Sequence, residues 1–449
     1  MDFNTILSNV KLTDNGDLAF KSPVIGKDED DLMLDILFKT EYYSTHLDEL
    51  PVLPRTMRCI KFAQFIRDPR YGLGKRDLGR RLLFNLKVNY KMILNCGRAD
   101  DLFYAYTDSY KDLCEFLYKE IQVKKNELVK KWMPRYSSKN KDLAIRIMNV
   151  WFKSEPNYIK RKQMYSHLIK ANTTEQHLSR KETDKIIFDQ VPSLASIKYA
   201  NRFSRGEDTK ERYHQYLEDV KAGKKEVKVS TTTPYDIYRN RYKINADIFF
   251  DALPKISGSW IPIIDSSGSM QNSNDSYGKA MAIGHYLAKC SSVCYNAAIS
   301  FSSQPRTLSM DNCNNYLEEI SSLHTGDWSN TDLASVMNLL SSLKLKGDID
   351  YPEFLVILSD MEFDEGSSTS IDYFNAINKN LGTKTKIVWW NLNSRNTTSP
   401  EMDESGNIFI SGYNPMILKY LEVGFDAKAF LSKLISEYDL AYKRNYEKW

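Results

Sequence analysis

The sequence predicts a multidomain α plus α/β protein, in which an N-terminal helical repeat array precedes a Rossmann-like α/β domain. The chain has 449 residues, more than one ordinary hydrophobic core accommodates, so two or more domains are expected. Between residues 30 and 220, apolar residues recur at three- and four-residue spacing, and no strand-like alternation interrupts them. After residue 258, short apolar runs alternate with helical segments, which indicates a mostly parallel sheet covered on both faces.

The first half of the chain is divided into short helices by glycine and proline residues, such as Gly97, Pro134 and Pro156. Many short helices in series, each with one apolar face, favour paired helices stacked as an irregular HEAT-like array. No fixed-period repeat is detectable, so we expect a repeat of structure rather than of sequence. The predicted helices are Asp31–Phe38, Met57–Ile66, Asp77–Leu86, Leu113–Val123, Asn126–Trp132 and Asp142–Trp151.

The second half begins after a change of composition at residues 221–235, KAGKKEVKVSTTTPY. We therefore assign residues 1–235 to the helical domain, 236–257 to a connecting segment and 258–449 to the α/β domain. The predicted strands are Trp260–Ile264, Tyr295–Phe301, Phe354–Leu358, Lys386–Trp390 and Asn407–Ile410. The predicted helices are Tyr277–Cys290, Asn315–Leu323, Asp332–Leu343 and Ser370–Asn380, followed by a helical tail from Pro415.

Charge is distributed unevenly along the chain. Residues 51–250 carry 42 Lys and Arg against 23 Asp and Glu, a net of +19. Residues 1–50 carry 4 against 11, and residues 251–449 carry 16 against 24. A basic excess over 200 residues favours a polyanionic partner. A solvated, lysine-rich helical surface with no such partner would have the same composition and stays an alternative.

Several function classes are disfavoured by simple features. The chain has no run of about 18 apolar residues, and its N-terminus lacks the basic start and apolar core of a signal peptide, so we expect a cytoplasmic protein without a membrane span. The six cysteines and six histidines form no zinc-type set, which indicates reduced thiols. No Ser/His/Asp or Cys/His set can be assembled either, so we expect no catalysis. A glycine-rich stretch at residues 72–76, GLGKR, lacks the Walker spacing and the Ser or Thr after lysine.

A metal site is predicted at the first strand-to-helix turn, where Asp265, Ser267 and Ser269 follow the apolar run in the order D-x-S-x-S. Loops at the carboxyl ends of strands converge in an open α/β sheet, so later loops can complete the site. Thr331 and Asp360 occupy such loops. A carboxylate and hydroxyls suit Mg²⁺, or another divalent cation such as Mn²⁺, which keeps several waters and needs few protein oxygens. A serine-capped helix start without an ion is the alternative.

These five residues resemble the metal-ion-dependent adhesion site of von Willebrand factor A domains, and the resemblance covers residues 258–449. It implies that an acidic group of a partner completes the shell of the metal ion. One position departs from the family pattern, because Asn330 precedes Thr331 where many members have glycine.

The helical half, taken with this domain, resembles the Ro autoantigen (TROVE) family, and most closely its poorly characterised bacterial and viral branch. The resemblance covers nearly the whole chain, and it implies a ring of helical repeats closed by the A domain. In that family, structured small RNAs bind outside the ring and RNA ends bind in its hole, so a ribonucleoprotein that binds structured or misfolded RNA is expected. The stretches that carry the resemblance are Arg67–Asn85, Cys96–Leu102, Lys131–Arg135, Val191–Ser193 and Arg212–Gly223.

Three basic clusters with nearby tyrosines are the candidate RNA contacts. Arginine and lysine suit phosphate oxygens, and tyrosine rings stack on exposed bases. The candidates are Arg67, Arg70, Lys75, Arg76, Arg80 and Arg81, then Lys130, Lys131 and Arg135, then Lys160, Arg161 and Lys162. Two readings follow: a non-enzymatic, Ro-like RNA-binding scaffold whose A domain docks an acidic group through Mg²⁺, or a protein-interaction module, cellular or viral, with no RNA ligand. A third reading, a metal-dependent hydrolase, would require turnover that disappears when Asp265 or Asp360 is substituted.

Overall fold

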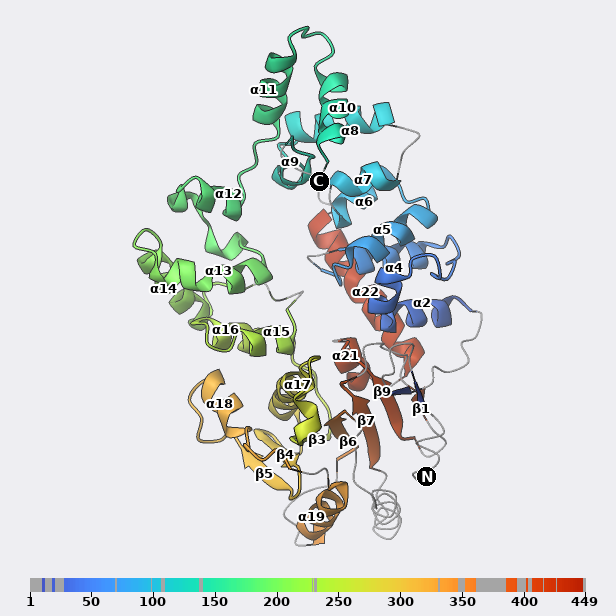
Figure 1. Ribbon diagram of the computed structural model, residues 1–449, viewed down its shortest axis with the longest axis vertical. Helices are drawn as coiled ribbons and strands as arrows, with labels where there is room; N and C mark the ends of the chain where they lie inside the picture. The colour runs from blue at the N-terminus through green and yellow to red at the C-terminus, as the bar shows by residue number, and fades with distance from the viewer. Residues whose placement is uncertain are drawn as a thin grey trace. The chain divides into compact units, whose positions relative to one another are not determined.

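The computed structural model describes two compact units, Met1–Thr45 with Thr232–Leu431, and His46–Thr231 with Ser432–Trp449. The described residues are 10–12, 18–20, 28–68, 71–97, 99–105, 110–136, 140–227, 229, 232–329, 332–345, 352–360, 385–393, 401–402, 406–414, 416–424 and 426–446. The predicted fold class is confirmed, because one unit is built of helices and the other of a largely parallel sheet with helices (Figure 1). No helix in these ranges is both long enough and apolar enough to span a membrane.

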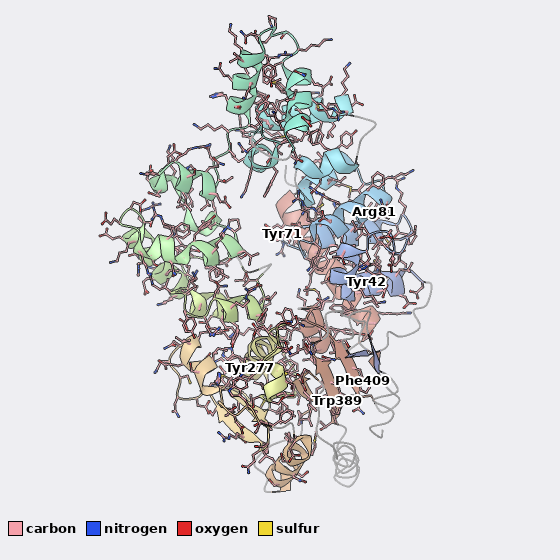
Figure 2. All side chains as sticks on the ribbon, viewed as in Figure 1. Tyr42, Tyr71, Arg81, Tyr277, Trp389 and Phe409 are labelled. Atoms are coloured by element: carbon pink, nitrogen blue, oxygen red, sulfur yellow. The ribbon has the colours of Figure 1, made fainter. Side chains whose placement is uncertain are left out.

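The α/β unit is organised around a sheet whose seven described strands follow the order β5-β4-β3-β6-β7-β9-β8. Strands β4, β3, β6, β7 and β9 are parallel to their neighbours in that order, while β5 and β8 join the edges antiparallel. Trp389 of β7 lies opposite Phe409 of β9 in this ladder (Figure 2). The strands are β3 Trp260–Asp265, β4 Ala297–Phe301, β5 Arg306–Ser309, β6 Phe354–Ser359, β7 Lys386–Asn391, β8 Glu401–Met402 and β9 Ile408–Ser411.

Both faces of the central strand are buried, which explains its continuous apolar run. Ile261 and Ile263 of β3 join one apolar core with Val336 and Met337 of helix α19, Leu333–Leu345. Helix α17, Ser276–Cys290, covers the opposite face, where a Cβ on Gly284 would lie 2.5 Å from the side chain of Ile264. A glycine at this point therefore lets α17 approach β3 closely.

Further helices complete the α/β unit. These are α2 Glu29–Phe38, α3 Thr40–Thr45, α15 Pro234–Arg239, α16 Ala246–Asp251, α18 Tyr316–Ser322 and α21 Met416–Glu422, with the short strands β1 Val10–Leu12 and β2 Leu18–Phe20. The buried ring of Phe38 lies 5.5 Å from Tyr420 and 6.1 Å from Phe430, between ring centroids. The predicted helix Ser370–Asn380 lies outside the described residues.

The helical unit consists of short helices that pack on their neighbours in the chain, as α4 does on α5, α10 on α11, and α13 on α14. Its helices are α4 Met57–Arg67, α5 Arg76–Asn85, α6 Tyr90–Cys96, α7 Ala99–Ala105, α8 Tyr110–Gln122, α9 Glu127–Trp132, α10 Lys141–Trp151, α11 Tyr158–Leu168, α12 Thr174–Ser179, α13 Ser193–Arg205 and α14 Lys210–Lys221. Two 3-10 turns, η1 Thr183–Lys185 and η2 Phe188–Gln190, connect α12 to α13.

The two units are not continuous in sequence, unlike the predicted domains of residues 1–235 and 258–449. Residues 28–45 pack with the α/β unit through the apolar face of α2, and the structure divides the last helix, α22 Ala427–Tyr446, after Leu431. The remainder of α22 packs in the helical unit, where Tyr438 donates a hydrogen bond of 3.1 Å to buried Asp68. Sequence periodicity predicts that one face of an amphipathic helix is buried, but it does not predict which element covers that face. The packing of α2 in the α/β unit and of the end of α22 in the helical unit could therefore not be predicted from the sequence.

Candidate functional site

The predicted metal loop begins where β3 ends, at the centre of the sheet. Asp265 is the last residue of β3, and the 3-10 turn η3, Gly268–Met270, leads toward α17. Because β3 lies between the parallel strands β4 and β6, the residues that follow all three strands lie at one edge of the sheet. Asp360 follows β6 directly and is 2% exposed.

The Asp265 carboxylate is fully buried and held in a defined orientation. One oxygen accepts a hydrogen bond of 2.9 Å from the backbone N–H of Ser267, and the other accepts one of 2.6 Å from the Ser359 hydroxyl. Burial raises the pKa of Asp265 to about 7, the two serines oppose this rise, and the charge of Asp360 adds to it. A cation bound at this edge would compensate the negative charge that burial disfavours.

The two loop hydroxyls complete a set of hard oxygen donors. The Oγ atoms of Ser267 and Ser269 are 3.1 Å apart, close enough to face one ion. Across the described part of the chain, no three His, Cys, Asp or Glu side chains come together, so the donor set is one of hydroxyls and few carboxylates. Such a set fits Mg²⁺ or Mn²⁺, which take oxygen ligands and retain waters, and it does not fit a zinc site.

Thr331 lies outside the described residues, as does Asn330 before it. The residues on either side are held at the carboxyl end of β4. The Ser329 hydroxyl accepts a hydrogen bond of 3.2 Å from the backbone of Ser303, and the backbone N–H of Asp332 donates one of 2.9 Å to Ser302. The structure thus brings Asp265, Ser267, Ser269 and Asp360 to one edge and leaves the fifth predicted ligand untested.

Ser359 is a member of this site that the sequence pattern did not predict. Its hydroxyl donates directly to the Asp265 carboxylate. The available signal was its position, because it ends β6 one residue before Asp360. Parallel pairing of β3 and β6 places the two strand ends side by side.

The first predicted RNA cluster is partly built into the fold. Arg67 is 1% exposed, and its guanidinium lies 2.6 Å from the buried carboxylate of Asp101. Arg80 pairs with the same carboxylate and is also largely buried. These two arginines therefore have a structural role. The prediction that they contact RNA at the surface is wrong, because both are largely buried against Asp101.

The rest of that cluster is less accessible than its charge indicates. Lys75 and Arg81 are partly buried, whereas Arg76 is exposed. Lys75 and Arg76 each have an interaction partner within the chain. Arg70 lies outside the described residues.

The second cluster is largely neutralised by neighbouring carboxylates. Lys130 lies 2.8 Å from Glu127, and Lys131 lies 3.0 Å from Glu175. Arg135 is partly buried and has an interaction partner within the chain. Most of the positive charge of this cluster is therefore neutralised by ion pairs within the protein.

The third cluster lies on the exposed helix α11, in which only Tyr165 is buried. Lys160 and Lys162 are exposed, and Arg161 donates a hydrogen bond of 3.0 Å to the Asn149 side chain. No acidic residue occupies the first turn, although a helix N-terminus favours negative charge. Lys160 and Arg161 lie in that turn and Lys162 follows it, and cations at this end of a helix disfavour it unless an anion approaches them.

The neighbouring helix and the flanking loops enlarge this basic region. Residues 141–170 hold seven Lys and Arg against two Asp and Glu. We call six of these cations, those that follow the first turn of α10, the α10–α11 basic surface: Arg146, Lys153, Lys160, Arg161, Lys162 and Lys170. Within the described chain, none of the six forms an ion pair. Arg146, Lys153 and Lys170 were missed because each is a single charge in the sequence.

Exposed apolar side chains lie among these cations. Tyr158 is 46% exposed, Ile159 65% and Met164 43%, all on α11. The Arg161 guanidinium lies 6.0 Å from the ring centroid of Tyr158. Cations interleaved with an accessible ring can contact a phosphate backbone and stack on a base.

Comparisons with known proteins give remote similarities. Two family models match, each described only as a domain of unknown function, DUF7788 over residues 259–439 and DUF2828 over residues 155–273. A curated relative, Uncharacterized protein L728 of Acanthamoeba polyphaga mimivirus, is 26% identical over an alignment of 294 residues, and the match covers 57% of this chain and 50% of that protein. The chain thus spans about half the length of this relative.

A similar solved structure is the Ro (RSR) protein of Deinococcus radiodurans. The match covers 94% of this chain and 96% of that one, with 12% sequence identity and a TM-score of 0.41. At these values the resemblance to the Ro family stays a prediction.

Proposed function

We propose that the protein is a non-enzymatic scaffold that binds structured RNA through the α10–α11 basic surface. The observation that carries this proposal is a set of six cations that form no ion pair with any residue the structure describes, on a hairpin that also exposes Tyr158. Five of the six are exposed, and Arg161 is partly buried. Exposed cations displace the counterions of a polyanion when they neutralise its phosphates, and the lysines near α9 that pair with carboxylates contribute less. The partner is thus a polyanion whose bases are accessible for stacking, which is the chemistry of structured RNA with unpaired segments.

Charge reversal on α11 tests this function. Lys160→Glu with Lys162→Glu should weaken binding of a stem-loop RNA at least tenfold at physiological salt, and should reduce the slope of log affinity against log salt by about two. Fluorescence anisotropy over a series of salt concentrations measures both quantities. Lys198→Glu with Lys210→Glu is the matched control, because both lysines are exposed in the same unit and the net charge changes equally.

The two variants separate the possible outcomes. An equal loss in both would mean that RNA responds only to net charge, and unchanged binding in the α11 variant would remove this surface from the proposal. Wild-type protein that binds no RNA at all would favour the protein-interaction reading.

The metal edge supports a second part of the same proposal, in which a divalent cation at Asp265, Ser267 and Ser269 docks an acidic group of a partner. When bound, the ion would supply a positive charge with open coordination positions. The protein's own contribution is to orient the Asp265 carboxylate through Ser359 and the Ser267 backbone, so that the loop hydroxyls face the same point.

Loss of the carboxylate charge tests the metal site. Asp265→Asn should weaken Mn²⁺ binding at least tenfold, measured from the electron paramagnetic resonance signal of free Mn²⁺, because an amide offers no charge to the ion. Ser273→Ala, an exposed serine of the same loop, should bind Mn²⁺ as the wild type does. Retention of full affinity in Asp265→Asn would contradict the site and leave the RNA proposal unaffected.

A further inference from the structure

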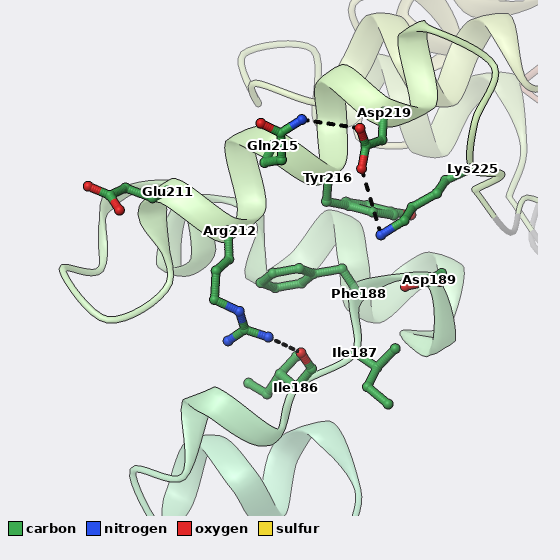
Figure 3. A pocket seen from close by; sticks show the side chains of 10 residues that line it. All are labelled: Ile186, Ile187, Phe188, Asp189, Glu211, Arg212, Gln215, Tyr216, Asp219 and Lys225. Carbon is green, nitrogen blue, oxygen red and sulfur yellow. Dashed lines mark hydrogen bonds and ion pairs between the residues drawn. The ribbon is translucent and has the colours of Figure 1, made fainter.

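A pocket of about 520 Å³ lies in the helical unit, between the 3-10 turn η2 and helix α14. Phe188 and Tyr216 form its aromatic wall, with ring centroids 5.7 Å apart (Figure 3). Asp189, Glu211 and Asp219 contribute three carboxylates, against the two cations Arg212 and Lys225. The local charge is therefore negative, in contrast to the basic chain around it.

One of the two cations is already used to hold the fold together. The Arg212 guanidinium donates hydrogen bonds of 2.9 Å to the carbonyl of Thr183 and 2.7 Å to that of Ile186. It also lies 5.4 Å from the ring centroid of Phe188. Arg212 thus holds in place the turns that form one wall of the pocket. Its hydrogen-bond partners are backbone carbonyls and not a carboxylate of the pocket.

The other cation marks a binding position. The Nζ atom of Lys225 lies 5.7 Å from the ring centroid of Tyr216 and 3.8 Å from the carboxylate of Asp219 (Figure 3). Lys225 follows the end of α14 and is 40% exposed, and its ion pair is long. An aromatic face beside a carboxylate is a favourable place for an ammonium or guanidinium group.

Two further lining residues, Asp189 and Ile187, are available to contact a ligand in addition to the groups that Lys225 contacts. Asp189 lines the same pocket as Tyr216, and its charge contributes to the raised pKa of that phenol, after the larger effects of burial and of Tyr213. Among the residues that the structure describes, Asp189 has no ion pair or hydrogen bond. Ile187 is 53% exposed at the rim, which provides an apolar contact next to the charged position.

We infer that this pocket binds a lysine or arginine side chain of a partner polypeptide, with an apolar neighbour resting on Ile187. Lys225 occupies the cation position in the unbound protein and is displaced when the ligand enters. Phosphate groups are disfavoured, since they would meet the three carboxylates. The pocket therefore provides a peptide-docking site separate from the basic surface on α10 and α11, and it does not depend on the RNA proposal.

A neutral analogue of the ligand tests the requirement for charge. The full chain is titrated with the dipeptide Nα-acetyl-leucyl-arginine amide, and with the same dipeptide carrying citrulline, which has nearly the shape of arginine without its charge. Binding is followed by calorimetry and by ligand-observed NMR. The arginine peptide should bind at least fivefold more tightly, and equal affinities would overturn the proposal.

Three variants give effects of different sign. Asp189→Asn with Asp219→Asn should weaken the arginine peptide at least fivefold, whereas Lys225→Gln should strengthen it about threefold by vacating the cation position. Glu218→Gln, an exposed residue of α14 outside the pocket, should change nothing. Weaker peptide binding in Lys225→Gln, or displacement of the peptide by a single-stranded RNA oligomer, would overturn the assignment and indicate an anionic ligand instead.

Discussion

Asp101 holds two arginines that the amino-acid sequence alone presents as surface charge. Its carboxylate is 1% exposed and pairs with both Arg67 and Arg80. A buried ion pair adds little net stability, yet removal of one partner leaves an uncompensated buried charge. Asp101, Arg67 and Arg80 are therefore expected to affect stability mainly when one of the three is substituted and its partners are left buried without compensation.

The Asp101→Asn variant should lower the free energy of unfolding of the helical unit by about 3 to 5 kcal/mol. Urea denaturation followed by circular dichroism at 222 nm measures the change. Asp112→Asn, which alters an exposed carboxylate on α8, should stay within about 0.5 kcal/mol of the wild type. A loss below about 1 kcal/mol in Asp101→Asn would mean that Arg67 finds other compensation.

His285 gives the α/β unit a dependence on pH. The ring is fully buried, lies 4.3 Å from that of Phe250 between centroids, and places Nε2 2.7 Å from the Glu319 carboxylate. Burial lowers the pKa of His285, against the opposing effect of Glu319. The unfolded state, in which histidine titrates near pH 6.5, then binds more protons than the folded state in mild acid.

Stability should therefore fall as the pH drops below about 6.5, and His285→Gln should fall less steeply between pH 6.5 and pH 5. Thermal denaturation midpoints at a series of pH values compare the two proteins. Identical slopes would show that His285 is not the group that titrates. His46→Gln is a suitable control, since this histidine is exposed.

At the scale of elements, buried and strongly periodic segments were predictable from sequence, and exposed edges were not. The apolar runs that became β3, β6 and β7 were found because both of their faces are covered. Strand β5 was missed because the side chains of Arg306–Ser309 are mostly exposed and show no alternation. The two-residue strand β8 is too short to leave a pattern.

The candidate sites follow the same division. The order D-x-S-x-S at the end of an apolar run was enough to predict the loop of Asp265, because chain connectivity alone brings those residues together. Ser359 joins the site through parallel strand pairing, which sequence spacing does not reveal. In the sequence, Arg80 and Lys160 are both cations within a basic cluster, and nothing near them distinguishes their roles. In the structure, Arg80 pairs with buried Asp101, whereas Lys160 is exposed.

At the scale of the whole molecule, the last helix shows that neither unit is continuous in sequence. Phe430, near the start of α22, packs in the α/β unit 5.0 Å from Tyr420, between ring centroids. Later in the same helix, Tyr438 packs in the helical unit 5.7 Å from Phe65, and its hydroxyl donates to Asp68. Each unit therefore depends on residues far from most of its own sequence.

Substitutions at the two ends of α22 should accordingly act on different units. Tyr438→Ala removes a buried ring and leaves the Asp68 carboxylate without one donor, which should cost the helical unit about 3 to 5 kcal/mol. Hydrogen exchange should then accelerate in α4, while β3 and β6 keep their protection. Phe430→Ala should show the opposite pattern, with faster exchange in α2 and α21 and little change in α4. If either variant accelerated exchange equally in both units, the chain would unfold as one cooperative body, and the division within α22 would have no energetic meaning.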